Sequence, residues 1–393
     1  MMKKIKLLFI LISCFYLTGC YNYRELNELS IASSIGLDKT ENGVSVTVQV
    51  INAKKEGSDN NSSSNFAKII AFEAEAETVQ EALRSIVTQI PRRLYLNHLT
   101  LLVIGEDLAK EGLDNHFDFL ARDPESRKEY HVVVAKDAKA NDVLKILTGL
   151  ETVPSEKVIN SLNATNQYMA TVSEVTLNDF LDQLLDDKQE ISLPVIKIVG
   201  NEEEGEQKES LETSTPKANL IIDGMAVFKD NKLIGYLDDS ESKTLTFLKD
   251  DISNALISYY CSETEKNVIE LNNSSTDIEV SKNELKVKIS VKGNGNISEI
   301  NCPVDLEKEE TIEEITESIN KRIEEKLTEG INNIINKYNT DVLGFRLSFY
   351  RTNPNYYKTL EDNWYQEHFK NLEFEIKADI ELEQKGAIIE VIN

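Results

Sequence analysis

Residues that carry chemistry are scarce in this chain of 393 residues, which has four cysteines, four histidines and one tryptophan. It contains no G-x-S-x-G elbow, no Walker glycine loop and no H-E-x-x-H pattern. The histidines lack the spacing of metal ligands and stand at His98, His116, His131 and His368. Carboxylates are so abundant that no pair of them points to a site. The sequence therefore favours a binding or scaffolding protein over an enzyme, without a metal or a cofactor.

Positive charge is also in short supply. Lysine and arginine number 43 against 68 aspartates and glutamates, which gives a formal net charge of −25. Such a surface repels phosphate groups, so nucleic acid is excluded as a partner. The hydrophobic content of 40% is nevertheless enough for the cores of two or three domains.

Long apolar runs are absent except near the N-terminus, and none reaches the roughly 20 residues of a membrane-spanning helix. The N-terminal run, residues 7–17, follows three lysines and ends in Leu17-Thr18-Gly19-Cys20. Basic residues, an apolar run and a small-residue cleavage site in that order are typical of a signal peptide, here with a bacterial lipobox. The competing interpretation is a short buried helix followed by an ordinary cysteine. We predict cleavage after Gly19 and a diacylglyceryl group on Cys20, with a further N-acyl chain left open.

A lipid on Cys20 would anchor the protein without other help. Burial of each acyl methylene is worth about 0.8 kcal/mol, and two chains are enough for stable anchoring. No basic cluster follows Cys20 in the sequence, so we expect the lipid to hold the membrane alone. The body of the protein is then expected on the outer face of the cell membrane.

Two further cysteines remain in the mature chain, Cys261 and Cys302. Outside the cytoplasm they could form one disulfide, or they could stay as two small buried thiols. The sequence leaves both states open.

The N-terminal half alternates strands with helices, which indicates a mixed α/β fold. Valines alternate with polar residues over 43–50 and predict a half-buried strand. Thr78 and Glu81 have capping-box spacing and open a helix that we expect to run to Pro91. Residues 56–65 form a polar loop. The other elements expected in this half are strands at 99–104 and 130–135 and helices at 107–113, 141–147 and 176–187.

The C-terminal half follows an acidic stretch, residues 200–217, which is too poor in apolar residues to fold alone. A turn at Asp230-Asn231 predicts a hairpin over 220–237. Isoleucines and leucines recur every three or four residues over 309–338 and predict a long amphipathic helix that packs on its own sheet. The remaining expected elements are a helix at 240–258, strands within 266–300 with turns or bulges at 272–275 and 293–296, helices at 342–350 and 356–368, and a strand at 372–383.

These patterns divide the chain into a signal peptide (1–19), an N-terminal mixed α/β region (20–199), an acidic linker or loop (200–217) and a C-terminal mixed α/β domain (218–393). The N-terminal region is long enough to hold more than one domain. Whether residues 218–255 pack with that region is left open.

Several segments together resemble the Ger(x)C family, the lipoprotein C subunits of spore germinant receptors. The likeness begins at Cys20-Tyr21-Asn22-Tyr23-Arg24-Glu25 and spans nearly all of the mature chain. Tyr21 and Asn22 depart from the tryptophan and aspartate that the family often has there, but Tyr21 keeps an aromatic ring suited to the membrane interface. Later pieces are 35–38, Asn97-His98, 104–106, Arg122-Asp123-Pro124-Glu125 with Arg127, 223–228, 233–237, Glu241-Ser242, 341–345, Pro354, Trp364 and Gly386.

The resemblance implies three mixed α/β domains and a non-enzymatic role on the outer face of the spore inner membrane. It implies two membrane partners, a germinant receptor A subunit and a transporter-like B subunit, with which the C subunit responds to nutrients. Arg24, Glu25, Arg122 and Asp123 match family positions, and we assign them to fold or interface. The alternative function is a solute-binding lipoprotein of a transport system, and a lipoprotein hydrolase is a third.

Overall fold

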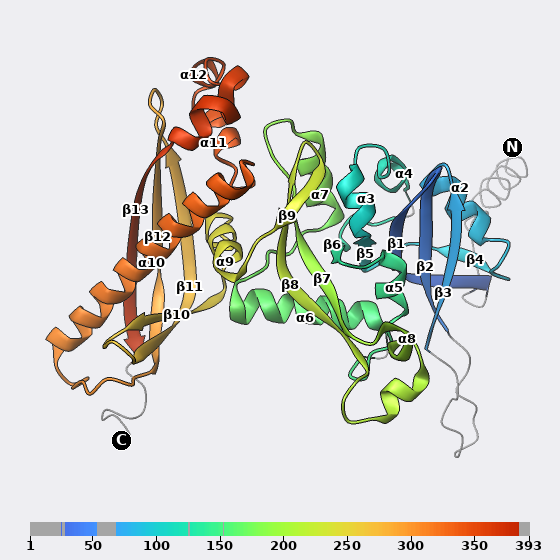
Figure 1. Cartoon of the computed structure of the whole chain (residues 1–393), viewed down its shortest axis with the longest axis horizontal. Coiled ribbons are helices and arrows are strands. Elements are labelled where there is room, and N and C mark those ends of the chain that lie inside the picture. Colours follow the sequence, from blue (N-terminus) through green and yellow to red (C-terminus); the bar gives the residue numbers. More distant parts are fainter. Residues whose placement is uncertain (1–24, 26–27, 53–67, 125, 152, 385–393) are drawn as a thin grey trace, which may run out of the picture.

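The computed structural model describes residues 25, 28–52, 68–124, 126–151 and 153–384. Cys20, Arg24 and the loop at 56–65 lie outside these residues. The described chain is mixed α/β, as the sequence predicts, and forms a large and a small sheet that follow one another along the long axis (Figure 1). The family resemblance implies three domains. The two sheets that the described strands form do not by themselves decide the number of domains.

The large sheet has nine strands in the order β3-β2-β1-β5-β6-β7-β8-β9, with β4 paired to the start of β1. Strands β1, β5, β6 and β7 are parallel, whereas β2, β3, β8 and β9 are antiparallel to their neighbours. The strands are β1 (Leu29–Thr40), β2 (Gly43–Ile51), β3 (Ile69–Ala76), β4 (Arg93–Tyr95), β5 (Leu101–Ile104), β6 (His131–Lys136), β7 (Ser192–Gly200), β8 (Ala218–Lys229) and β9 (Lys232–Tyr236).

Helices cover both faces of this sheet. Leu102 and Ile104 of β5 belong to the core under α2, α3, α4 and α7, while Leu101 and Val103 belong to the core under α5 and α6. Burial on both faces explains the continuous apolar sequence of β5. The helices are α2 (Val79–Ile86), α3 (Glu106–Glu111), α4 (Asp118–Arg122), α5 (Ala140–Lys145), α6 (Pro154–Met169), α7 (Leu177–Leu185) and α8 (Glu202–Gly205).

The alternating strand β2 is more buried than its pattern predicts. Its valines face one core as expected, but Thr47 and Gln49 on the polar face are also fully buried. Helix α5 covers them: Asn141 Nδ2 donates to Thr47 Oγ1, and Gln49 Nε2 donates to the backbone oxygen of Leu144. The prediction of a half-buried strand is therefore wrong, because hydrogen-bonded polar side chains can be buried as well.

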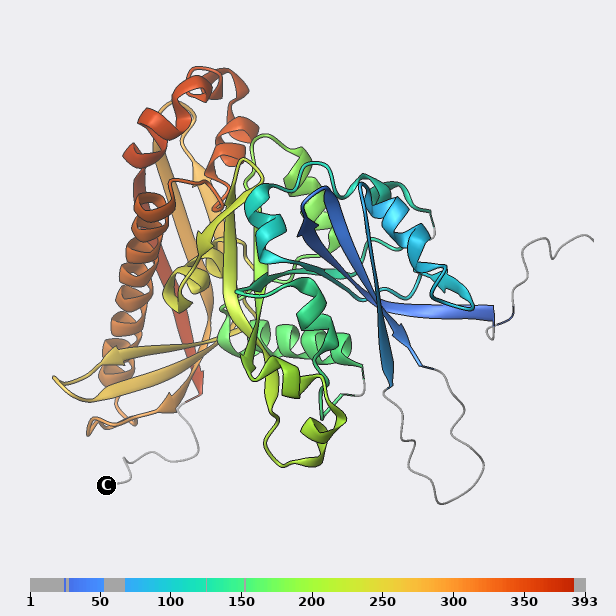
Figure 2. The ribbon, with the colours of Figure 1, turned by 45° about the vertical axis from the view of Figure 1, so that its right-hand side comes forward.

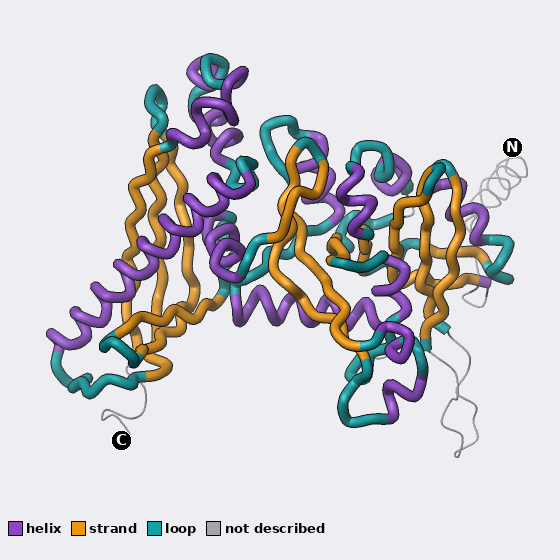
Figure 3. The backbone as a smooth tube through the Cα atoms, in the orientation of Figure 1, coloured by secondary structure: helices purple, strands orange, loops and turns teal. Residues whose placement is uncertain are grey.

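The small sheet contains β10 (Asn254–Tyr260), β11 (Lys266–Val280), β12 (Lys286–Glu299) and β13 (Glu373–Gln384), in that order. The long helix α10 (Glu309–Tyr338) crosses one face of it (Figure 3). The predicted stripe is buried there, including Ile319, Ile323 and Ile331. The other helices of this part are α9 (Asp239–Leu248), α11 (Phe345–Thr352) and α12 (Pro354–Tyr357), with shorter turns η3 (Glu361–Asn363), η4 (Trp364–His368) and η5 (Phe369–Asn371).

Several local predictions are confirmed. The hairpin turns at Asp230 and Asn231, which both have positive φ (50° and 60°), the geometry that such turns need. Thr78 and Thr176 cap α2 and α7. The register of β11 against β12 shifts between Asn272 and Ser275, as a bulge there requires.

Three helix predictions are wrong. The helix expected over 240–258 ends at Leu248, Asp250 adopts a left-handed conformation, and β10 begins at Asn254. The helix expected to run to Pro91 ends at Ile86. The helix expected over 356–368 is instead α12, which ends at Tyr357, followed by the short elements η3 and η4. Helix α6, which begins with Pro154, was not predicted, because few of its buried residues are apolar.

The structure also decides the question that the sequence left open for residues 218–255. Strands β8 and β9 pair with β7 inside the large sheet, so residues 218–236 belong with the N-terminal region. Of the two alternatives given for the acidic stretch, a linker or a loop, the structure has the loop. It connects the adjacent antiparallel strands β7 and β8, and it contains α8 and the short turn η2 (Lys208–Glu212).

Candidate interaction sites

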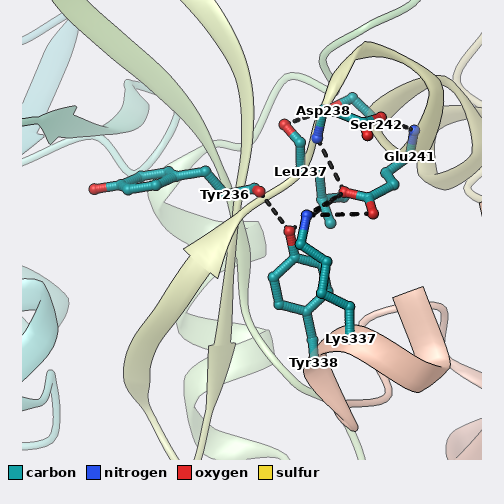
Figure 4. Close-up of polar contacts among 7 residues, drawn as sticks. All are labelled: Tyr236, Leu237, Asp238, Glu241, Ser242, Lys337 and Tyr338. Carbon is teal, nitrogen blue, oxygen red and sulfur yellow. Dashed lines mark hydrogen bonds and ion pairs between the residues drawn. The ribbon is translucent and has the colours of Figure 1, made fainter. Parts of the chain in front are cut away.

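A polar cluster joins the two sheets where β9, α9 and α10 meet (Figure 4). Glu241 is 2% exposed and closes a capping box with Asp238, whose backbone N–H donates to Glu241 Oε2. From α10, Lys337 Nζ lies 3.3 Å from the same oxygen. The Tyr338 hydroxyl donates to the backbone oxygen of Tyr236 and lies 3.3 Å from Glu241 Oε2. These contacts hold the end of α10 against the last strand of the large sheet.

A second contact between the sheets is made by Tyr365, whose hydroxyl donates to Glu190 Oε1 at 2.6 Å. Lys229 Nζ, from β8, lies 4.5 Å from the centre of the Tyr365 ring and donates to the backbone oxygen of Asn339. Burial raises the pKa of the Glu190 carboxyl. Neither Glu190 nor Tyr365 carries a local sequence signal, so sequence reasoning missed both.

Asp341 lies beside this contact and is 1% exposed. It accepts hydrogen bonds from the backbone N–H groups of Phe345 and Arg346, at the start of α11. Burial outweighs these bonds and raises the pKa of Asp341 to about 7. The nearby Glu190 carboxyl acts in the same direction.

Segments that carry the family resemblance, although far apart in the sequence, meet at this junction. Residues 223–228 lie in β8, residues 233–237 include the end of β9, and Glu241 lies in the first turn of α9. Residues 341–345 lead into α11. The structure therefore gives these matching segments a common role in holding the two sheets together.

Arg122 and Asp123 lie elsewhere, on a groove of about 830 Å³ between α2, α4 and β4. Arg122 pairs with Asp118 one turn earlier at 2.8 Å, and its side chain is 79% exposed. Glu25 is exposed as well. The interface roles assigned to Glu25, Arg122 and Asp123 stay predictions. The groove is lined by Gln80, Leu83, Arg84, Val87, Arg93, Leu94, Leu96, Asp118, Phe119, Arg122, Asp123 and Pro124.

Cys261 and Cys302 are joined by a disulfide in the structure, with their Cα atoms 6.2 Å apart. Cys261 follows β10 and Cys302 follows β12, so the bond spans the strand β11 between them. The oxidation state of the pair in the cell stays a prediction.

Among the described residues, no group of three or more histidine, cysteine, aspartate and glutamate side chains could hold a metal ion. None of the described helices combines the length and the apolar character that a membrane span requires.

Known proteins resemble this chain over both of its parts. Residues 22–198 match the family described as spore germination protein N-terminal domain, and residues 223–386 match spore germination B3/GerAC like, C-terminal. Spore germination protein KC of Bacillus subtilis (strain 168) is 31% identical over 388 residues, which cover 96% of this chain and 94% of that protein. Spore germination protein B3 of the same organism is 21% identical over 383 residues, 95% of each chain.

A solved structure agrees with the fold. The crystal structure of the GerBC protein covers 92% of this chain and 99% of its own, with a TM-score of 0.52 and 18% sequence identity. The protein is therefore of the spore germination class, with a role in germination rather than in solute transport. It belongs to the Ger(x)C family, whose members are germinant receptor C subunits.

Proposed function

We propose that this protein is the lipid-anchored C subunit of a nutrient germinant receptor, held on the outer face of the spore inner membrane by Cys20 and bound there to the A and B subunits. The match to germination proteins in both parts of the chain carries the proposal. The lipobox supports the anchor. We also infer that the subunit binds these partners without a catalytic activity of its own.

The position of the first strand gives the anchor a consequence for assembly. Strand β1 begins at Leu29, and the chain between Cys20 and Leu29 spans at most about 30 Å when fully extended. A lipid on Cys20 would keep the large sheet within that distance of the bilayer. Such a tether raises the effective concentration against membrane subunits to the order of millimolar. Weak contacts between subunits are then sufficient for assembly.

A structural role for the buried acids supports a non-catalytic subunit. Glu241 is engaged by Asp238 and Lys337, and Asp341 is engaged by backbone N–H groups. Both acids hold elements of the fold in place. We therefore expect the subunit to contribute binding and geometry to the receptor.

The Cys20→Ala variant tests the anchor and the function together. Spores of this strain should lose the lipid on the subunit, co-purification with the membrane subunits and the response to the nutrient. The Cys14→Ala variant, within the signal peptide, is the matched control and should germinate normally. Normal nutrient germination of a Cys20→Ala strain that lacks the lipid contradicts the proposal. Loss of response to one nutrient class in a deletion strain, restored by the intact gene, tests the receptor role by itself.

A further inference from the structure

An exposed group of arginines lies at the end of the large sheet where β1 begins. Residues 82–105 contain no aspartate or glutamate, but they contain Arg84, Arg92 and Arg93. Residues 342–360 also lack acidic residues and carry three cations, but they lie in the part of the chain that packs on the small sheet. We call the surface formed by residues 84–93 and β4 the arginine face.

The fold brings this face next to the start of the described body. Strand β4 pairs with the first residues of β1, so that Arg93 lies opposite Leu29 and Tyr95 lies opposite Ile31. Helix α2 and strand β4 lie at the end of the molecule that is far from the small sheet (Figures 1 and 2). The sequence shows no basic cluster after Cys20, and strand pairing places Arg93 beside the start of β1 instead.

The side chains on this face combine cations with apolar surface. Arg84, Arg92 and Arg93 are exposed, and Val87 beside them is 48% exposed. Within the described part of the chain, Arg84 and Arg92 have no ion-pair partner. Asp118 across the groove is already paired with Arg122. Two arginines are thus available to an external anion, next to apolar residues that line the groove.

We propose that the arginine face binds the headgroups of anionic phospholipids and orients the anchored protein with its small sheet away from the bilayer. The proposal rests on the proposed attachment through Cys20. A guanidinium group matches phosphate oxygens with two parallel hydrogen bonds. Each basic residue near an anionic membrane strengthens binding roughly fivefold. Exposed apolar residues such as Val87 can enter the headgroup boundary.

Charge elsewhere on the molecule favours the same orientation. A bilayer with anionic lipids repels an acidic body, and this repulsion acts over about one Debye length, roughly 8 Å. Attraction at the arginine face and the repulsion expected from the net negative charge of the chain together favour one orientation. The tether, which attaches at the same end, makes that orientation sterically accessible.

Vesicle flotation tests the proposal with the mature chain carrying Cys20→Ser, which cannot be lipidated. The protein should float with vesicles that contain phosphatidylglycerol, fail to float with phosphatidylcholine alone, and be released by high salt. Arg84→Gln/Arg92→Gln should weaken binding roughly twentyfold. The matched control changes the same number of exposed cations on strand β12 of the small sheet: Lys288→Gln/Lys292→Gln.

The outcomes separate this proposal from the proposed function. Absence of flotation with phosphatidylglycerol, or equal loss of binding in the arginine and lysine variants, overturns the lipid site. So does normal flotation of the arginine variant with loss of co-purification of the membrane subunits, which indicates a protein contact instead. None of these results depends on lipidation or germination, so the anchor and receptor role are still decided by the Cys20→Ala spores. Unchanged thermal unfolding of each variant shows that the fold is intact.

Discussion

Gly235 of β9 lies directly against the ring of Tyr338 at the end of α10. A Cβ atom added at Gly235 would come 2.6 Å from Tyr338 Cε1, closer than such atoms pack. The ring has little freedom to move away, because its hydroxyl donates to the backbone oxygen of Tyr236. This close approach, together with the Glu241 cluster, sets how the large and small sheets meet.

Gly235→Ala is expected to destabilise the protein by about 1–3 kcal/mol, because the added methyl group forces the Tyr338 ring or β9 to shift. The free energy of unfolding in urea measures this effect. Gly149→Ala is the matched control, since a Cβ at Gly149 meets no atom within 4 Å. The control should change stability by less than about 0.5 kcal/mol. Equal effects of the two variants would show that the junction tolerates the methyl group.

Glu241→Ala is expected to destabilise the junction by about 1–3 kcal/mol. The change removes a capping acceptor from the Asp238 N–H and the partner of Lys337. Glu241→Gln keeps an acceptor oxygen and should cost less. Hydrogen exchange at residues 236–242 should accelerate in the alanine variant more than in the glutamine variant. Identical exchange in the two would rule out a capping role for this side chain.

The raised pKa of Asp341 predicts that the free energy of unfolding falls as the pH rises. Burial raises its pKa to about 7 in the folded protein, above the value near 3.9 of an unfolded chain. The folded state therefore binds a proton that the unfolded state has released. Its contribution is complete below about pH 4 and is lost as the pH rises through about 7, and it amounts to at most about 4 kcal/mol. Glu190, whose pKa is also raised by burial, acts in the same direction.

Urea unfolding at about pH 5 and about pH 8 measures this dependence. Other acidic groups also affect how the free energy of unfolding changes with pH. The parent protein is therefore compared with Asp341→Asn, in which residue 341 does not titrate. The variant should lose less stability than the parent between the two pH values. A parent and a variant with the same pH dependence would mean that Asp341 is charged throughout.

The Cys261–Cys302 disulfide predicts that the oxidised protein has a larger free energy of unfolding than the reduced protein. Cys261 and Cys302 are 41 residues apart, and closing a loop of that length stabilises a fold by about 4 kcal/mol in the chain-entropy model. Cys261→Ser/Cys302→Ser should lose up to this amount, and the reduced parent should match the variant. Labelling of free thiols in protein taken from spores checks the pairing. Two reactive thiols in that protein would show that the cysteines are unpaired there.

Local signals predicted the elements whose structure depends on neighbours in the sequence. The apolar stripe of α10 follows from the helical period. The capping role of Thr176 follows from a hydrogen bond to a residue three positions later. The turn at Asp230 and Asn231 follows from residues that accept positive φ. The helix predicted over 240–258 failed because β10 is stabilised by pairing with β11, which periodicity within one segment does not report.

The functional surfaces were less accessible to sequence reasoning. The Cys261–Cys302 pairing depends on a Cα separation of 6.2 Å that spacing alone does not give. Glu190 and Tyr365 are 175 residues apart in the chain, and no sequence motif connects them. The absence of acidic residues over 82–105 can be read in the sequence, but the position of Arg93 beside the start of β1 depends on the pairing of β4 with β1.

Sequence alone was thus sufficient for the lipobox, the acidic balance, the mixed α/β class and the family resemblance, because each is written in composition or in short ordered motifs. Tertiary structure decided three other matters: that β8 and β9 complete the large sheet, which acids are buried at the junction, and that arginines border the start of β1. Strand pairing and burial arise from contacts between residues far apart in the chain, and their free energy appears only when the whole fold is formed.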